Sequence, residues 1–258
     1  MKIQFESSTS CNAKCIFCPR YEMTRPMGVM SDALFHKIIK EGKEMGVKHF
    51  YPFLNGEPFI FPRIYKWLDY MEKEKVWVSL YTNAEFMDVD RLVKYKNIYF
   101  INCSLNAATK EIYDKIMRGC DFYKAKKNIG DLIKKSSFRI RVSMVVNEEN
   151  AHENRMFRKM WGKNAKVSYY LNWAGKRHSL FESKGIKKPC YHLLNFITIL
   201  WDGRVALCCM DYNGNVILGD LNKQSLKEIV KNIEPLIERH KKLDFNMPLC
   251  QECNMNTL

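Results

Sequence analysis

Several features that direct proteins to membranes or out of the cell are missing from this sequence of 258 residues. No run approaches the roughly 18 consecutive apolar residues that a membrane span requires. The opening residues, MKIQFES, carry a charge but no apolar stretch behind it, which argues against a secretory signal peptide. Internal repeats and low-complexity segments are also missing. We therefore expect a soluble, cytoplasmic protein with no membrane partner.

The charge is strongly basic, with 42 Lys and Arg residues against 28 Asp and Glu residues and a net charge of +14. Such a balance can favour nucleic acid, phosphorylated substrates or an acidic redox partner. The lysines are scattered, however, and a lysine-rich composition alone would give the same charge. Residues 134–141 and 238–242 are therefore predicted to be solvated faces, and nucleic acid is not the favoured partner.

The composition also suggests a folded protein that uses its thiols. A hydrophobic content of 47% is enough to bury one large domain, or one domain with a small appendage. The chain has ten cysteines, which would indicate disulfides in a secreted protein. In the reducing cytosol, metal ligation or redox chemistry is the expected use of these residues.

Short β-branched or aromatic runs alternate with helical patterns over most of the chain, which is typical of a parallel sheet with crossover helices. The predicted strands are residues 2–7, 47–54, 76–81, 98–105, 138–146 and 166–171. The predicted helices are residues 31–45, 62–74, 88–95, 109–117, 122–135 and 150–161. Six such units are too few for a closed eight-stranded barrel, so we predict an α/β fold, a partial (β/α)6 TIM-like barrel, over residues 1–180.

Chemistry in such a barrel is expected at the carboxyl ends of the strands, and the unusual residues of this chain fall there. The first strand is followed by three cysteines and the second by an Asn-Gly-Glu-Pro sequence. Thr82 and Asn83 follow the third strand, and Ser104 to Asn106 end the fourth.

The pattern changes after about residue 180. Two β-rich runs, FITIL and GRVALCC, are joined at Asp202-Gly203, which is a strong hairpin signal. A helical stretch follows at residues 224–240, and the sequence CQEC lies near the end. Residues 181–258 are predicted to form a separate small domain.

Cys11, Cys15 and Cys18 can hold three irons of a 4Fe-4S cubane and leave the fourth iron without a protein ligand. An open metal position is where a small molecule can bind. A zinc loop is the alternative, but zinc would need a fourth Cys or His nearby, and the next histidine is His36, inside a predicted helix.

The sequence CNAKCIFC resembles the CxxxCxxC signature of the radical S-adenosylmethionine (SAM) superfamily, and it follows the first strand as it does there. The resemblance implies that SAM binds the open iron and is cleaved reductively to a 5'-deoxyadenosyl radical, which removes a hydrogen from the substrate. It also implies an electron donor of the flavodoxin or ferredoxin type. The protein would then orient the cofactor and exclude water.

The sequence LNGEPF is similar to the GGEP motif of that superfamily, with Asn55 in place of the first glycine. Gly56 permits close approach of the backbone, and Glu57 can accept hydrogen bonds from the methionine ammonium of SAM. Pro58 completes the motif. By itself, Gly-Glu-Pro would be an ordinary turn.

The resemblance implies further cofactor contacts at strand ends and near the cysteines. Ser104 and Asn106 match positions that contact the ribose or carboxylate, Arg118 is a candidate carboxylate clamp, and Phe17 matches a residue packed near adenine. A capping Ser or Asn and a surface Arg would look the same in the sequence. The full set of predicted cofactor contacts is Phe17, Asn55, Gly56, Glu57, Pro58, Thr82, Asn83, Ser104, Asn106 and Arg118.

A second set of cysteines, at Cys190, Cys208, Cys250 and Cys253, brackets the predicted hairpin and suits either zinc or an iron-sulfur cluster. The sequence from Gly203 to Val230 resembles SPASM and twitch domains, which carry auxiliary 4Fe-4S clusters. The small number of cysteines favours a twitch domain with one fully ligated cluster. The implied cofactors are thus two 4Fe-4S clusters and SAM.

Cys209 directly follows Cys208 and would point the opposite way if the strand continued, because side chains alternate along a strand. It is then either a core thiol, as free cysteines often are, or a hydrogen-atom donor that faces the substrate.

The length and the single auxiliary cluster resemble the twitch-type dehydrogenases that oxidise a secondary alcohol of an aminocyclitol. We therefore expect oxidation of a small polar substrate such as a sugar or cyclitol. Epimerisation and maturation of a ribosomal peptide are the alternatives. Many maturases carry a leader-binding domain of ~80 residues, whereas the first strand here begins at residue 2.

A hypothesis of another class is a non-catalytic iron-sulfur protein, either an electron carrier or a nucleic-acid-binding protein. It leaves Glu57 and the open cluster position without a purpose. Binding of SAM would separate the two classes.

Overall fold

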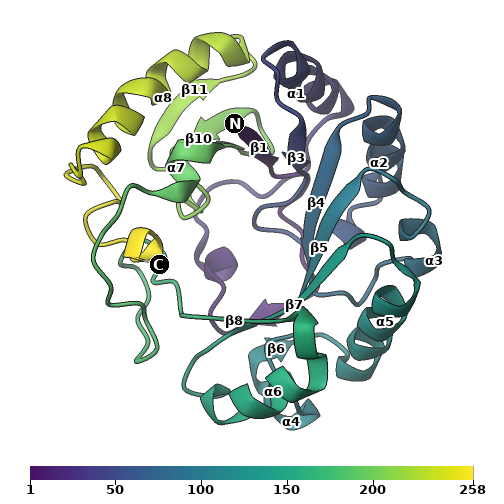
Figure 1. The fold of residues 1–258 in the computed structure, drawn as a ribbon. Coiled ribbons are helices and arrows are strands. Elements are labelled where there is room, and N and C mark those ends of the chain that lie inside the picture. Colours follow the sequence, from purple (N-terminus) through teal and green to yellow (C-terminus); the bar gives the residue numbers. More distant parts are fainter. Residues whose placement is uncertain (258) are drawn as a thin grey trace.

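The computed structural model describes residues 1–257, and six parallel strands form one side of its curved nine-stranded sheet (Figure 1). Each strand pairs with the next one along the chain. All six predicted strands are confirmed, although several end a few residues earlier than predicted. They are β1 (Lys2–Phe5), β3 (His49–Tyr51), β4 (Trp77–Thr82), β5 (Ile98–Ser104), β7 (Arg139–Val145) and β8 (Ala165–Ser168).

Helices connect these strands and lie outside the curve of the sheet (Figure 1). The predicted start at Ser31 is confirmed, because its side chain accepts a hydrogen bond from Leu34 N. The helix predicted at residues 88–95 is shorter than expected. The helices are α1 (Asp32–Glu44), α2 (Ile64–Lys73), α3 (Val89–Leu92), α4 (Lys110–Ile116), α5 (Phe122–Lys135) and α6 (Asn154–Trp161).

The two faces of the sheet differ in polarity because side chains alternate along each strand. On β5, Ile101 and Cys103 are fully buried in the apolar core. Asn102 points to the other, concave face, where its amide donates to Ser143 Oγ at 2.7 Å. The fold is thus an α/β partial TIM-like barrel with an apolar outer layer and a polar inner face.

The carboxyl-terminal strands extend the same sheet beyond β1. They are β9 (Phe196–Ile199), β10 (Arg204–Ala206) and β11 (Ile217–Asp220). β9 pairs in parallel with β1, while β10 pairs antiparallel with both β9 and β11. The predicted hairpin is confirmed, with Gly203 at a positive φ of 95° in its turn. The boundary near residue 180 stays a prediction, since the hairpin continues the sheet of the barrel.

Two helices accompany the hairpin. α7 (Tyr191–Asn195) was not predicted, whereas α8 (Leu226–Lys241) corresponds to the helix predicted at residues 224–240. Ser225 and Glu228 form a capping box at the start of α8. None of the helices in residues 1–257 combines the length and the apolar content that a membrane span requires.

Candidate active site

The loop with the first three cysteines follows β1 and is held by a small two-stranded sheet. β2 (Lys14–Cys15) pairs antiparallel with β6 (Met117–Arg118), so that Cys15 lies opposite Met117. The amide of Cys18 donates to Cys15 O at 3.1 Å and closes a turn. Neither strand was predicted, because two-residue strands leave no periodic pattern in a sequence.

The three thiols of this loop lie in a poorly solvated place and close to one another. Burial, and then the nearby Glu57, raises the pKa of the Cys11 thiol to about 12. Burial also raises the pKa of the Cys18 thiol. The pKa of the Cys15 thiol is raised by burial first and then by the neighbouring Cys18 and Cys11. Such thiols stay protonated unless cations compensate the thiolate charge, as a metal cluster does.

A site for a single metal ion needs a different arrangement of side chains from a site for a cluster. Within residues 1–257, no three Cys, His, Asp or Glu side chains have the spacing to hold one metal ion. A cubane does not need that spacing, because each thiolate bonds a different iron.

The Asn-Gly-Glu-Pro segment lies directly against the chain that leads into Cys11. The amide of Glu57 donates to Ser10 O at 2.8 Å. A Cβ atom on Gly56 would lie 2.1 Å from Ser8 O, a distance that no side chain can tolerate. Only glycine fits at this position, which confirms the expected close approach of the backbone.

The carboxylate of Glu57 is 3% exposed and joins two of the predicted strand ends. One of its oxygens accepts from Thr82 Oγ1 at 2.6 Å and from Phe59 N at 3.1 Å, and the other accepts from Asn83 N at 2.7 Å. Burial raises the pKa of Glu57 to about 7, although these hydrogen bonds act against it. A carboxylate has about four acceptor positions, so one remains for a ligand.

Asn12 connects the cysteine loop to this group and was not predicted. Its Oδ1 accepts from Asn83 Nδ2 at 2.8 Å, and its Nδ2 donates to Glu85 Oε2 at 2.7 Å. Asn12 Nδ2 also lies 3.3 Å from the Cys120 thiol. Its place next to Cys11 was the only signal in the sequence.

A buried ion pair lies under the site and explains the unusual Asn55. Glu6 is fully buried and lies 2.7 Å from Arg25 Nη2, while Asn55 Nδ2 donates to the same Glu6 oxygen at 3.1 Å. Arg25 Nε also donates to Tyr212 O at 2.7 Å, which ties the cysteine loop to the carboxyl-terminal hairpin. An asparagine can make this bond to Glu6, and a glycine cannot.

Ser104 and Asn106 lie at the end of β5, but their side chains bond within the barrel. Asn106 is buried at a positive φ of 61°, and its Oδ1 accepts from Val145 N at 3.0 Å. Ser104 Oγ lies 3.5 Å from Ser143 Oγ on the concave face. Asn106 thus braces β5 against β7, and the role of both residues in cofactor binding stays a prediction.

Phe17 belongs to the cysteine loop and Arg118 to β6 beside it, and neither reaches the carboxylate of Glu57. The exposed Arg118 donates through Nε to Lys115 O at 3.2 Å. The carbonyl of Phe17 accepts from Trp173 Nε1 at 3.0 Å, so its backbone anchors residues from the carboxyl-terminal half. Their predicted contacts with SAM remain predictions.

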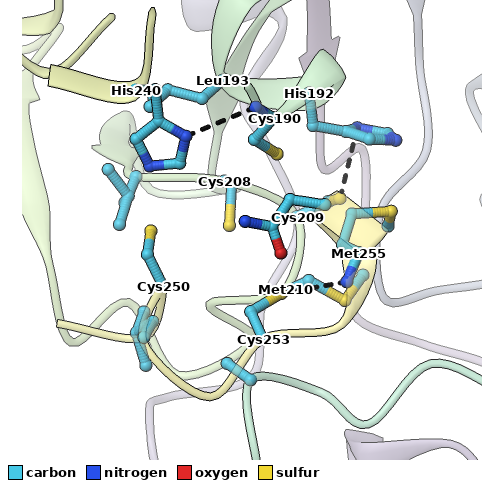
Figure 2. Close-up of a pocket in the computed structure, with 14 residues that line it drawn as sticks. Cys190, His192, Leu193, Cys208, Cys209, Met210, His240, Cys250, Cys253 and Met255 are labelled. Atoms are coloured by element: carbon cyan, nitrogen blue, oxygen red, sulfur yellow. Dashed lines mark hydrogen bonds between the residues drawn. The ribbon is translucent and has the colours of Figure 1, made fainter. Parts of the chain in front are cut away.

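The second set of cysteines surrounds one mostly apolar cavity (Figure 2). Cys190 precedes α7, Cys208 follows β10, and Cys250 and Cys253 follow α8. Burial raises the pKa of Cys250 to about 12, with Cys253 and Cys190 adding to the effect. Burial also raises the pKa of Cys208 well above its usual value. Four mutually close, desolvated thiols are a donor set that fits an iron-sulfur cluster.

Cys209 was expected to point away from Cys208 only if the strand continued, and the strand does not continue. β10 ends at Ala206, and the chain then turns, with Asp211 N donating to Cys208 O at 3.1 Å. Because the strand does not continue, both cysteines line the same cavity (Figure 2). The Cys209 thiol lies 3.5 Å from His192 Nδ1, and burial raises its pKa to about 12.

Comparison with protein families agrees with both cysteine sets. Residues 5–160 match the radical SAM superfamily, and residues 189–254 match the iron-sulfur cluster-binding domain called SPASM. The chain belongs to the radical SAM superfamily and carries a SPASM-type domain. Its cofactors are therefore 4Fe-4S clusters, one that binds SAM and one auxiliary, together with SAM itself.

One curated relative is the antilisterial bacteriocin subtilosin biosynthesis protein AlbA of Bacillus subtilis strain 168. It is 29% identical over 174 residues, which cover 66% of this chain but only 38% of AlbA.

Similar solved structures include Streptococcus suis SuiB bound to its precursor peptide SuiA, with a TM-score of 0.78 at 16% identity over 99% of this chain and 70% of SuiB. BtrN in complex with AdoMet and 2-DOIA gives 0.69 at 15% identity, covering 98% of this chain and 92% of BtrN. The AdoMet-bound anSMEcpe gives 0.72 at 17% identity over 99% of this chain and 88% of anSMEcpe. At these identities the similarity establishes the fold.

Proposed function

We propose that this enzyme oxidises a small polar substrate, such as a sugar or cyclitol, by removing two hydrogens from it. In this proposal Cys11, Cys15 and Cys18 hold the SAM-binding cluster, and Cys190, Cys208, Cys250 and Cys253 hold the auxiliary cluster. When bound, the first cluster and SAM supply a radical that takes one hydrogen atom from the substrate.

The Glu57 group positions the cofactor. Gly56 lets the backbone lie against the cysteine loop, and the remaining acceptor position of Glu57 receives the ammonium of SAM. Thr82 and Asn83 hold the carboxylate in place, and Asn12 links it to the loop. Reduced flavodoxin or ferredoxin supplies the electron, and the basic surface suits an acidic partner of this kind.

The oxidative outcome is supported by one observation: the thiols of Cys190, Cys208, Cys250 and Cys253 surround a single cavity, which Cys209 also lines. A cluster held by Cys190, Cys208, Cys250 and Cys253 would accept one electron from the substrate after loss of the hydrogen atom, and one proton would pass to the surroundings. Loss of the hydrogen atom, the electron and the proton together would be a two-electron oxidation of the substrate.

The concave face also suggests what the substrate carries. Arg141 on β7 lies over the Phe100 ring at 5.0 Å. It belongs to none of the ion pairs in the described part of the chain. We therefore propose that Arg141 binds acceptor oxygens of the substrate, with a carboxylate or phosphate bound most strongly.

A second function, epimerisation, is favoured by the position of Cys209. Leu54, which lies just after β3, packs against the cluster of Ala174, Cys209 and Met210, so Cys209 lies beside the carboxyl end of β3. A thiol there could return a hydrogen atom to the substrate. A peptide substrate also stays open, because AlbA and SuiB are named for peptide biosynthesis or peptide binding.

The test is an anaerobic reaction of the reconstituted enzyme with SAM, a reductant and a panel of sugars, cyclitols, their phosphates and short peptides in deuterated water. We expect deoxyadenosine together with a product that lacks two hydrogens. A product of unchanged mass apart from one solvent deuteron would instead establish epimerisation. Absence of deoxyadenosine would contradict the proposed radical chemistry.

A further inference from the structure

His240 has a buried nitrogen that faces the auxiliary-cluster cavity without a partner. The residue lies in the last turn of α8 and is 1% exposed. Its Nδ1 accepts from Cys190 N at 3.4 Å, and Phe245 contacts the ring edge-on at 5.1 Å. The ring proton therefore belongs on Nε2, since Nδ1 acts as the acceptor. Nε2 has no hydrogen-bond partner within residues 1–257.

Asn256 is a second unpaired donor on the same cavity. Its side chain is 5% exposed, and neither Nδ2 nor Oδ1 has a partner in the part of the chain that the structure describes. A buried donor without an acceptor destabilises the fold. Two such donors beside one cavity indicate that whatever fills the cavity accepts hydrogen bonds.

The remaining lining of the cavity limits what that acceptor is. Apart from the cysteines and histidines, its side chains are mostly apolar, such as Leu193, Leu207 and Leu249. Figure 2 shows the His240 ring on the same side of the cavity as Cys250. The acceptors that fit are the sulfur atoms of a cluster, both inorganic sulfide and cysteine thiolate.

We propose that His240 and Asn256 donate hydrogen bonds to sulfur atoms of the auxiliary cluster and so raise its reduction potential. Reduction adds negative charge to the cluster, and hydrogen bonds to sulfur stabilise the more negative state. The two residues are positioning residues that make the cluster a better electron acceptor. This inference rests on the proposed function, in which the cluster receives the electron of the substrate.

His240 is a donor in this arrangement and not an iron ligand. A histidine that binds iron through Nε2 must carry its proton on Nδ1. Here Nδ1 already accepts from Cys190 N, so the two roles are incompatible.

The experiment uses the full chain with Cys11, Cys15 and Cys18 replaced by Ala, so that only the auxiliary cluster contributes. Its reduction potential is measured by anaerobic redox titration followed by electron paramagnetic resonance. His240→Phe and Asn256→Leu remove the donors, and His240→Gln keeps an N–H group near Nε2. Met255→Leu is the matched control, because it changes the lining of the same cavity without removing a donor.

We expect His240→Phe to make reduction about tenfold less favourable, which is about 59 mV for one electron. Asn256→Leu should shift the potential in the same direction, and His240→Gln should restore most of the loss. Unchanged potentials in both donor variants, with the iron content retained, would overturn the inference. Loss of iron in His240→Phe and in His240→Gln would overturn it as well, since it would make His240 a ligand. If the variant with Cys11, Cys15 and Cys18 replaced by Ala holds no cluster at all, that result would contradict the proposed function, in which the second set of cysteines binds the auxiliary cluster.

Discussion

The Cys209 thiol lies 3.5 Å from Nδ1 of His192, on the wall of the cavity that Cys208 also lines. Burial keeps this thiol protonated, and Leu54, just after β3, packs against the cluster that contains it. Two roles follow from this position: a packing residue beside the cluster, or a donor of a hydrogen atom.

Replacement of Cys209 by Ala separates these roles. If the auxiliary cluster accepts the electron, we expect turnover to stay largely intact, because Cys209 then only packs against the cluster. The measurement is product formation relative to deoxyadenosine. Deoxyadenosine that accumulates without product in the variant, together with one solvent deuteron in the product that the unmutated enzyme makes in deuterated water, would establish Cys209 as the donor. Cys103→Ala serves as a control, since this thiol is buried in the core.

Replacement of Glu57 by Gln should weaken SAM binding by roughly 1 to 3 kcal/mol, because a neutral amide is a poorer partner for an ammonium than a carboxylate. Equilibrium binding of SAM to the reconstituted protein measures the effect. Glu153→Gln is the matched control. Glu153 is also a buried carboxylate, and it accepts from Ala108 N at 2.6 Å, far from the cysteine loop in sequence. Equal affinities of the Glu57 variant and the parent would show that the carboxylate only shapes the turn.

Replacement of Arg141 by Met should raise KM for an anionic substrate about 10- to 100-fold, since a hydrogen bond to a charged group contributes about 1.5 to 3 kcal/mol. We expect kcat to change little, because Arg141 binds the substrate and does not take part in hydrogen abstraction. Arg139→Met removes the same charge from the exposed start of β7 and serves as the control. A KM unchanged for phosphorylated and carboxylated substrates alike would rule out this role.

His49 should make the stability of the chain depend on pH. Burial, and then Lys2, lower the pKa of His49 to about 4, against an unfolded value of about 6.5. Between these values the unfolded chain binds a proton that the folded chain does not, so the free energy of unfolding falls as the pH drops from about 6.5 to about 4. Urea unfolding of the metal-free chain at pH 7 and pH 5 should show a smaller loss for His49→Gln than for the parent. Equal losses would contradict the shift.

Much of this site follows from the sequence because it lies at strand ends. The alternating pattern predicted six parallel strands, and parallel strands bring their carboxyl ends to one edge. Thr82 and Asn83 therefore meet Glu57, as the hydrogen bonds show. Gly56 was also predictable, because its motif implies a close approach of the backbone.

Other parts depend on partners that are distant in the chain and leave no local pattern. Arg25 pairs with Glu6 only once the cysteine loop has folded back over β1. The parallel pairing of β9 with β1 joins residues almost two hundred positions apart, and nothing in either strand specifies it. The surroundings of Cys209 could not be predicted, because the end of β10 depends on the turn that follows it.

The central claim is that this chain holds two 4Fe-4S clusters on the seven cysteines Cys11, Cys15, Cys18, Cys190, Cys208, Cys250 and Cys253. Iron, sulfide and zinc analysis of the anaerobically reconstituted protein tests it most directly. We predict about eight irons per chain, and about four after Cys11, Cys15 and Cys18 are replaced together by Ala, with cleavage of SAM abolished. About four irons and one zinc in the unmutated protein, or no loss of iron in the triple variant, would contradict the account.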